Sequence, residues 1–168
     1  MTISELRLIN DHTLQIDGVD YPCTIGRGGI AASGQKREGD LKTPSGIFPL
    51  RQCFYRPDRL SVPTTLLPVT ALKPNDGWCD DPASPQYNLP VQVPFASGHE
   101  KLWRDDNVYD LIIPLGYNDE TIVPGMGSAI FMHVMRDDGV GTEGCIALEK
   151  ETLLKLLPGF STYTVVKI

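Results

Sequence analysis

A cysteine and a histidine near the carboxyl end are residue types that carry out nucleophilic chemistry. Cys145 follows Gly144, and His133 lies twelve residues earlier in the strand-like stretch 128–135. In such a pair the imidazole takes the thiol proton, the thiolate attacks a carbonyl, and the imidazole returns the proton to the leaving group. A glycine before the nucleophile lets the backbone direct N–H groups at a developing oxyanion. The sequence therefore predicts a Cys145/His133 site.

Simpler interpretations of these residues exist. Free cysteines are often buried structural residues, and a histidine on an apolar strand is often a core residue. Cys23 and Cys53 lie among apolar neighbours and are interpreted in this way. The four cysteines form no CxxC pair, so neither a metal nor any other cofactor is expected. A thiol redox or thioester-transfer role for Cys145, with or without Cys79, stays open as an alternative.

The composition limits the classes of function. The 168 residues suit one domain, 1–168, with 41% apolar and 21% charged residues. The formal net charge of −6 and the lack of a basic stripe argue against a nucleic-acid partner. No stretch approaches the roughly 20 apolar residues that span a bilayer, and no leader pattern begins the chain. We therefore expect no membrane segment and a cytoplasmic location.

Alternating apolar residues predict short strands along most of the chain. The first three form a small meander that turns at Asn10-Asp11 and Asp17-Gly18. A polar, glycine-rich loop, 26–40, lacks the phosphate-binding pattern GxxxxGK[ST], so phosphate binding is the weaker interpretation. Turn-type residues predict a loop over 75–82. The predicted strands are 5–9, 12–16, 19–25, 47–50, 66–72 and 89–95 (both as edge strands), 108–115 (central), 129–135 and 163–168.

The leucines at 153, 154, 156 and 157 predict one helix over 149–157, which Pro158-Gly159 ends. The expected fold is therefore a mostly-β domain, a sandwich or partly open barrel with one or two short helices.

Three separated elements resemble the L,D-transpeptidase catalytic domain, also called the YkuD-type domain. They are the segment 42–48 (KTPSGIF), the strand that contains His133, and Gly144-Cys145-Ile146 followed by a small residue and Leu148. The resemblance spans about residues 24–148 and implies a β-rich, YkuD-like fold. It also implies that the partners are peptidoglycan stem peptides or muropeptides, which lose their terminal D-alanine.

The resemblance also assigns residue roles. Cys145 matches the nucleophile and His133 the base. The backbone carbonyl of Val134 would orient the imidazole, and the amides of Gly144 and Cys145 would form the oxyanion hole.

Two positions depart from the family pattern. Glu143 stands where the family usually has histidine, and Ala147 stands where it usually has arginine. A carboxylate at 143 would raise the pKa of both His133 and Cys145, or bind a substrate amine. With no arginine at 147, recognition of a substrate carboxylate falls to Arg27, Arg104 or Arg136.

Trp78 lies in an unusual cluster, Trp78-Cys79-Asp80-Asp81. It either lines the substrate cleft or pins the loop to the body of the protein. If this cluster lines the cleft, Asp80 or Asp81 would pair with an ammonium of the stem peptide.

Water is the expected acceptor in a cytoplasmic enzyme, which predicts an L,D-carboxypeptidase that trims tetrapeptides during wall recycling. L,D-transpeptidation and non-catalytic binding of wall peptides are the alternatives. The sequence leaves the oligomeric state open.

Overall fold

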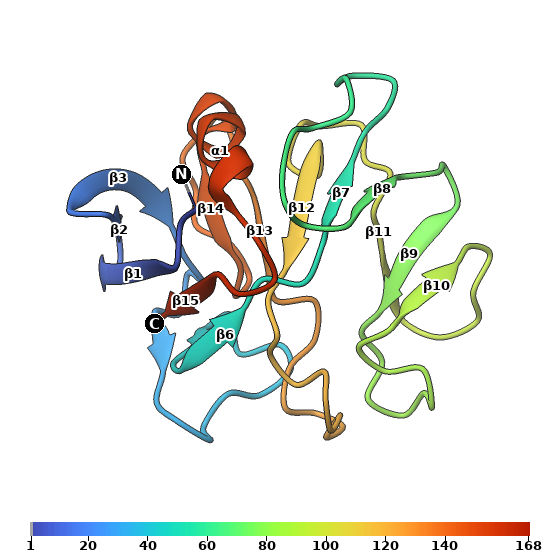
Figure 1. Ribbon diagram of the computed structural model, residues 1–168. Helices are drawn as coiled ribbons and strands as arrows, with labels where there is room; N and C mark the ends of the chain where they lie inside the picture. The colour runs from blue at the N-terminus through green and yellow to red at the C-terminus, as the bar shows by residue number, and fades with distance from the viewer. Residues whose placement is uncertain (1) are drawn as a thin grey trace.

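Residues 2–168 are described in the computed structural model, and their secondary structure is mostly β with one short α-helix (Figure 1). This confirms the fold class predicted from the sequence. Within residues 2–168, no helix has the length and apolar character that crossing a bilayer requires.

A ten-stranded mixed sheet forms the body of the protein. Leu50, which follows the strand 47–49 at one edge of the sheet, forms an isolated β-bridge with Leu115, which follows the strand 111–114 near the other edge. The sheet therefore curls back on itself as a partly open barrel. In spatial order its strands are β6 (Ile47–Pro49), β15 (Val165–Lys167), β1 (Glu5–Asn10), β2 (Thr13–Ile16), β3 (Val19–Thr24), β14 (Ile146–Leu148), β13 (Phe131–Val134), β12 (Leu111–Pro114), β7 (Cys53–Tyr55) and β8 (Val69–Ala71).

The predicted meander is confirmed as the antiparallel strands β1, β2 and β3. The central strand predicted over 108–115 is confirmed by β12, which is buried along its whole length. β8 lies at an edge of the large sheet, as predicted for 66–72.

Two smaller sheets complete the β structure. The pair β4 (Ile30–Ala31) and β5 (Thr43–Pro44) is parallel. In the three-stranded sheet, β9 (Asp76–Cys79) lies between the edge strands β10 (Pro90–Gln92) and β11 (His99–Lys101). The prediction of a loop over 75–82 is therefore wrong for residues 76–79, which form β9. Gly77 is needed for close strand approach rather than for a turn, since a Cβ there would lie 3.0 Å from the Glu100 carbonyl oxygen.

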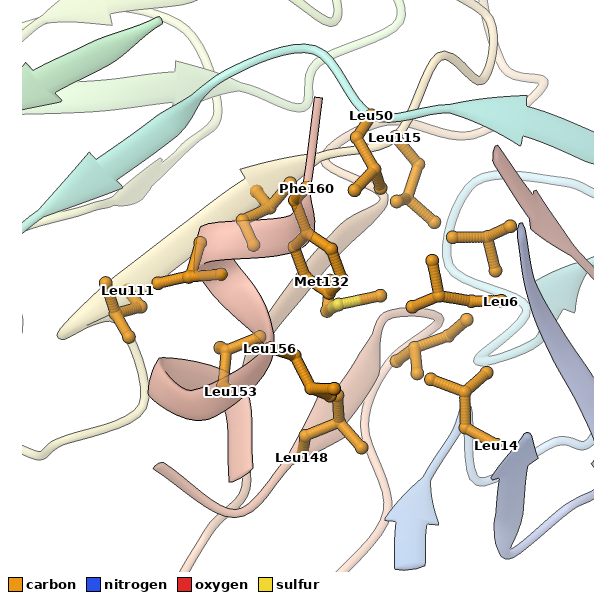
Figure 2. Packing of buried hydrophobic residues seen from close by; sticks show 14 of the residues in the cluster. Leu6, Leu14, Leu50, Leu111, Leu115, Met132, Leu148, Leu153, Leu156 and Phe160 are labelled. Atoms are coloured by element: carbon orange, nitrogen blue, oxygen red, sulfur yellow. The ribbon is translucent and has the colours of Figure 1, made fainter. Parts of the chain in front are cut away.

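The main hydrophobic core packs between strands of the large sheet and α1 (Lys150–Leu156) (Figure 2). Leu153 and Leu156 of the helix belong to the same apolar cluster as Met132 and Leu148. The helix confirms the prediction for 149–157, and it is followed by the 3-10 turn η1 (Leu157–Gly159).

The two faces of β13 have different surroundings. Met132 and Val134 point into the main core, while Phe131 belongs to a second apolar cluster with Trp78, Tyr109 and Cys145. His133 shares the Phe131 face, because alternate residues of a strand point the same way. Sheet alternation thus places the functional side chains opposite the main core.

Candidate active site

The parallel pairing of β13 with β14 brings the candidate nucleophile and base together. Met132 pairs with Ile146 and His133 with Ala147, so Cys145 lies beside Phe131 and two register positions from His133, on the same face of the sheet. Cys145 and His133 are 7% and 5% exposed, and both line one pocket of about 320 Å³. Both residues are buried, and both contribute to the lining of the same cavity.

The Cys145 sulfur contacts two backbone groups of the segment that leads into β13. Sγ donates to the Ala129 carbonyl at 3.2 Å and accepts from the Phe131 N–H at 3.3 Å. The carbonyl favours the thiol, whereas the N–H favours the thiolate. The sulfur is therefore oriented in both protonation states by one short segment, 129–131.

The His133 ring is oriented by its own strand. Nδ1 lies 2.8 Å from the Val134 carbonyl oxygen. A carbonyl only accepts, so Nδ1 carries the hydrogen and Nε2 keeps its lone pair. This is the contact that the sequence resemblance assigned to Val134, and it leaves the imidazole in the tautomer of a general base.

Tyr109 and Glu100 extend the site beside the histidine. The Tyr109 ring meets the His133 ring edge-on, with centroids 5.4 Å apart, and the Tyr109 hydroxyl donates to Glu100 Oε2 at 2.5 Å. Burial raises the pKa of the Glu100 carboxyl, and the nearby carboxylates Asp80 and Glu143 raise it further. Burial also holds the pKa of Tyr109 well above its ordinary value.

Burial gives the free site a neutral thiol and a neutral imidazole. Burial raises the pKa of Cys145, with Glu100 the next cause, and it lowers the pKa of His133 to about 4. Glu143 is a smaller cause that also raises the pKa of Cys145, as expected. The expected increase in the pKa of His133 is not found, because Glu143 is not among the groups that shift it and burial lowers this pKa more than the Val134 carbonyl and Asp106 raise it.

Gly144 holds the backbone before the nucleophile in a conformation that few other residues adopt. Its φ is +144°, and a Cβ there would lie 2.9 Å from the Lys42 carbonyl oxygen. The segment 42–48, one of the three elements of the resemblance, therefore packs directly against the nucleophile turn. The Gly144 N–H donates to Thr142 Oγ1 at 3.1 Å, and that hydroxyl donates to the Cys145 carbonyl at 2.6 Å. A substrate oxyanion must compete with Thr142 for the Gly144 amide.

The three candidate arginines, Arg27, Arg104 and Arg136, all line the pocket. Each already pairs with an acidic group: Arg27 with Glu143 at 3.4 Å, Arg104 with Asp106 and Arg136 with Asp138. The Glu143 side chain is 74% exposed, so it lies at the mouth of the pocket rather than against the sulfur. A substrate carboxylate would have to exchange with one of these acids.

Trp78 does not line this pocket. Its indole meets Phe131 edge-on at 5.0 Å between ring centroids, and its Nε1 donates to Asn88 Oδ1 at 2.9 Å. These contacts agree with the interpretation that Trp78 pins its segment to the body of the protein. Of its neighbours, Asp80 lines the pocket and Cys79 is a fully buried free thiol.

The ionisable residues around the site form no metal centre: among residues 2–168, no cluster of three or more histidine, cysteine or acidic side chains is placed to hold an ion.

Several residues of the pocket had no signal in the sequence. Glu100 lies in a short strand without clear alternation, and Thr142 is one polar residue in a polar turn. Lys36, in the glycine-rich loop, is 4% exposed and pairs with Asp40, so its cation belongs to the pocket wall. Tyr109 adjoins a strongly apolar run, where an aromatic residue predicts only burial.

Comparison with known proteins gives one family match. The family model for the L,D-transpeptidase catalytic domain, YkuD, matches residues 8–168. Searches of the curated proteins and of the solved structures gave no match.

Alkylation of the thiol tests the electrostatics of the site. Because the raised pKa of Cys145 keeps the sulfur protonated, the iodoacetamide rate at Cys145 in the free protein should rise about tenfold per pH unit from pH 7 to 9. Intact-mass kinetics, with Cys145→Ala as the background, measure this rate. A plateau reached near pH 6 would mean a preformed thiolate and would contradict the assignment.

Gly144→Ala tests the close approach to Lys42. The added Cβ meets backbone, so we expect a loss of about 1–3 kcal/mol in the free energy of unfolding, measured with urea. Gly139→Ala is the matched control, because Gly139 also has positive φ, +65°, but nothing lies within 4 Å of its Cβ position. Equal destabilisation of the two variants would show that the contact with Lys42 does not constrain the turn.

Proposed function

Since the chain belongs to the L,D-transpeptidase catalytic-domain family, YkuD, which acts on peptidoglycan peptides, we propose that it is an L,D-carboxypeptidase with Cys145 as nucleophile. The observation that supports this most directly is the shared pocket of Cys145 and His133, with the imidazole Nδ1 held by the Val134 carbonyl. The proposed substrate is a stem tetrapeptide, which loses its terminal D-alanine.

The first half of the reaction forms a thioester. His133 Nε2 takes the proton from Cys145 Sγ as the sulfur attacks the carbonyl carbon of the third stem residue. The carbonyl electron pair moves to oxygen, where the Cys145 amide, with Gly144 in competition with Thr142, donates to the oxyanion. The C–N bond then breaks, and D-alanine leaves with the proton from His133.

The second half releases the tripeptide. Water adds to the thioester carbonyl carbon while His133 Nε2 takes a proton from the water, and the C–S bond then breaks. The sulfur recovers the proton, which restores the neutral pair. A neutral thiol and a neutral imidazole suit this order of reaction steps, because the imidazole accepts a proton only in the steps that need a base.

The charges of the pocket suit a peptide end that carries both signs. Arg27, Arg104 and Arg136 offer guanidinium groups to the D-alanine carboxylate. The carboxyl groups of Asp80 and Glu100 are also in the lining and offer partners for an ammonium. The pocket volume of about 320 Å³ is near the lower end for ligand sites, which favours one stem peptide and water over two stem peptides. We propose that the reaction serves cytoplasmic recycling of wall fragments.

L,D-transpeptidation is the second candidate, and one feature favours it. Arg136 lines both the Cys145 pocket and a neighbouring depression of about 400 Å³. Acidic residues of this depression, Asp137, Glu149 and Glu151, would suit the amine of an acceptor stem peptide. A second peptide bound there would reach the thioester from the Arg136 side.

Product analysis separates these functions. We expect purified protein to convert free tetrapeptide into tripeptide and D-alanine, with the same sole products when an amine acceptor is added. Mass spectrometry of the products measures this, with Cys145→Ala as the inactive variant. Cys23→Ala, which removes a buried thiol from the main core, is the matched control and should retain activity.

Each other outcome identifies a different function. A cross-linked dimer as the main product would support transpeptidation. Tetrapeptide binding without turnover, with affinity unchanged by alkylation of Cys145, would support the non-catalytic binder that the changes at Glu143 and Ala147 suggest.

A further inference from the structure

Asn88 is a buried amide whose hydrogen bonds reach three separate segments. It is 5% exposed, and its Oδ1 accepts from both Trp78 Nε1 and the Ala129 N–H, each at 2.9 Å. Its Nδ2 donates to the Asn118 carbonyl at 2.8 Å. A buried amide satisfied on both sides fixes the relative positions of the groups it joins.

Ala129 is the link between this amide and the sulfur. Its φ is +53°, a left-handed conformation that is uncommon for a residue with a Cβ and that the surroundings must hold in place. Its N–H is held by Asn88, and its carbonyl oxygen accepts from Cys145 Sγ at 3.2 Å. The residue whose N–H is held by Asn88 thus also provides the carbonyl that orients the thiol.

The second contact of the sulfur is supported from the same amide. The Phe131 N–H donates to Sγ, and the Phe131 ring meets the Trp78 indole edge-on. Trp78 is fixed in turn by its Nε1 bond to Asn88. Both backbone groups that touch the sulfur therefore depend on the Asn88 carboxamide, one through Ala129 and the other through Trp78.

We propose that Asn88 is a positioning residue, which holds the Ala129 carbonyl and the Phe131 amide where they orient Cys145 Sγ for attack. The inference rests on the proposed role of Cys145 as nucleophile. Asn88 does not line the Cys145 pocket, so it acts through segment 129–131 and not on the substrate. Tetrapeptide binding should therefore depend little on it, whereas the chemical step should depend strongly.

The main test is Asn88→Gly, because glycine adopts the native φ of +58° at position 88 without strain and removes only the side chain. We expect kcat for tetrapeptide to fall about 10-fold to 100-fold with KM within about threefold of the wild type. Loss of the thiol's fixed acceptor should also make alkylation of Cys145 at pH 8 several times faster. Because unfolding would also expose the buried thiol, kcat and alkylation are both measured well below the unfolding transition of the variant, where the protein is folded.

Two further variants keep the test decisive. Trp78→Phe keeps a ring against Phe131 but removes the Nε1 donor, and it should change kcat and alkylation in the same direction by a smaller factor. Thr164→Ala is the control for stability, because it removes a fully buried hydrogen-bonding side chain outside the pocket. It should lower the melting temperature and leave kcat and alkylation unchanged in folded protein.

The results separate this inference from the proposed function. A folded Asn88→Gly with wild-type kcat and alkylation would overturn the positioning role. If that variant does not fold, an unchanged Trp78→Phe overturns it instead. Turnover that persists in Cys145→Ala refutes the nucleophile assignment, while the alkylation rates still decide whether Asn88 positions the sulfur.

Discussion

The parallel pairing of β13 with β14 is the constraint on which the site depends. It sets Met132 against Ile146 and His133 against Ala147, which leaves Cys145 beside Phe131 on the face opposite the main core. A shift of one residue in this register would turn His133 toward the leucines under α1. The packing of Met132, Val134, Ile146 and Leu148 in the main core therefore holds the geometry of the candidate active site as well as the fold.

Burial of the reacting groups explains the chemistry of the site better than charge pairing does. A thiolate and an imidazolium would both lose hydration in this cavity, and Glu100 adds a further cost to the thiolate. Both shifts favour a neutral resting pair, and in the proposed mechanism the proton moves only during attack. Ala147, directly beside His133 in the register and 1% exposed, leaves no charged group there to change this balance.

The features that the sequence predicts well are those with a short-range signal. The alternation in β1–β3, the apolar run at β12 and the leucines of α1 each reflect burial of one face, so the mostly-β class followed from the sequence. Cys145, His133 and Gly144 could be proposed as site residues because glycine, thiol and imidazole stand in a family order. The β9 strand was missed because Asp76-Gly77 has turn composition, although its glycine serves strand packing.

The rest of the site depends on contacts between distant segments. Glu100 reaches Tyr109, and Asn88 reaches Ala129 across 41 residues of sequence, so each contact depends on how separate segments pack in the folded chain. No local pattern encodes such a contact. The pKa of His133 likewise could not be predicted from Glu143, because the dominant cause is burial, which is a property of the folded chain.

The most direct measurement of the central claim is the covalent intermediate itself. Protein mixed with tetrapeptide, quenched in acid within the first turnovers and digested, should show the tripeptide acyl group on the peptide that contains Cys145. The same adduct should be absent from Cys145→Ala. Release of D-alanine with an acyl group on another residue, or with none on Cys145, would contradict the account.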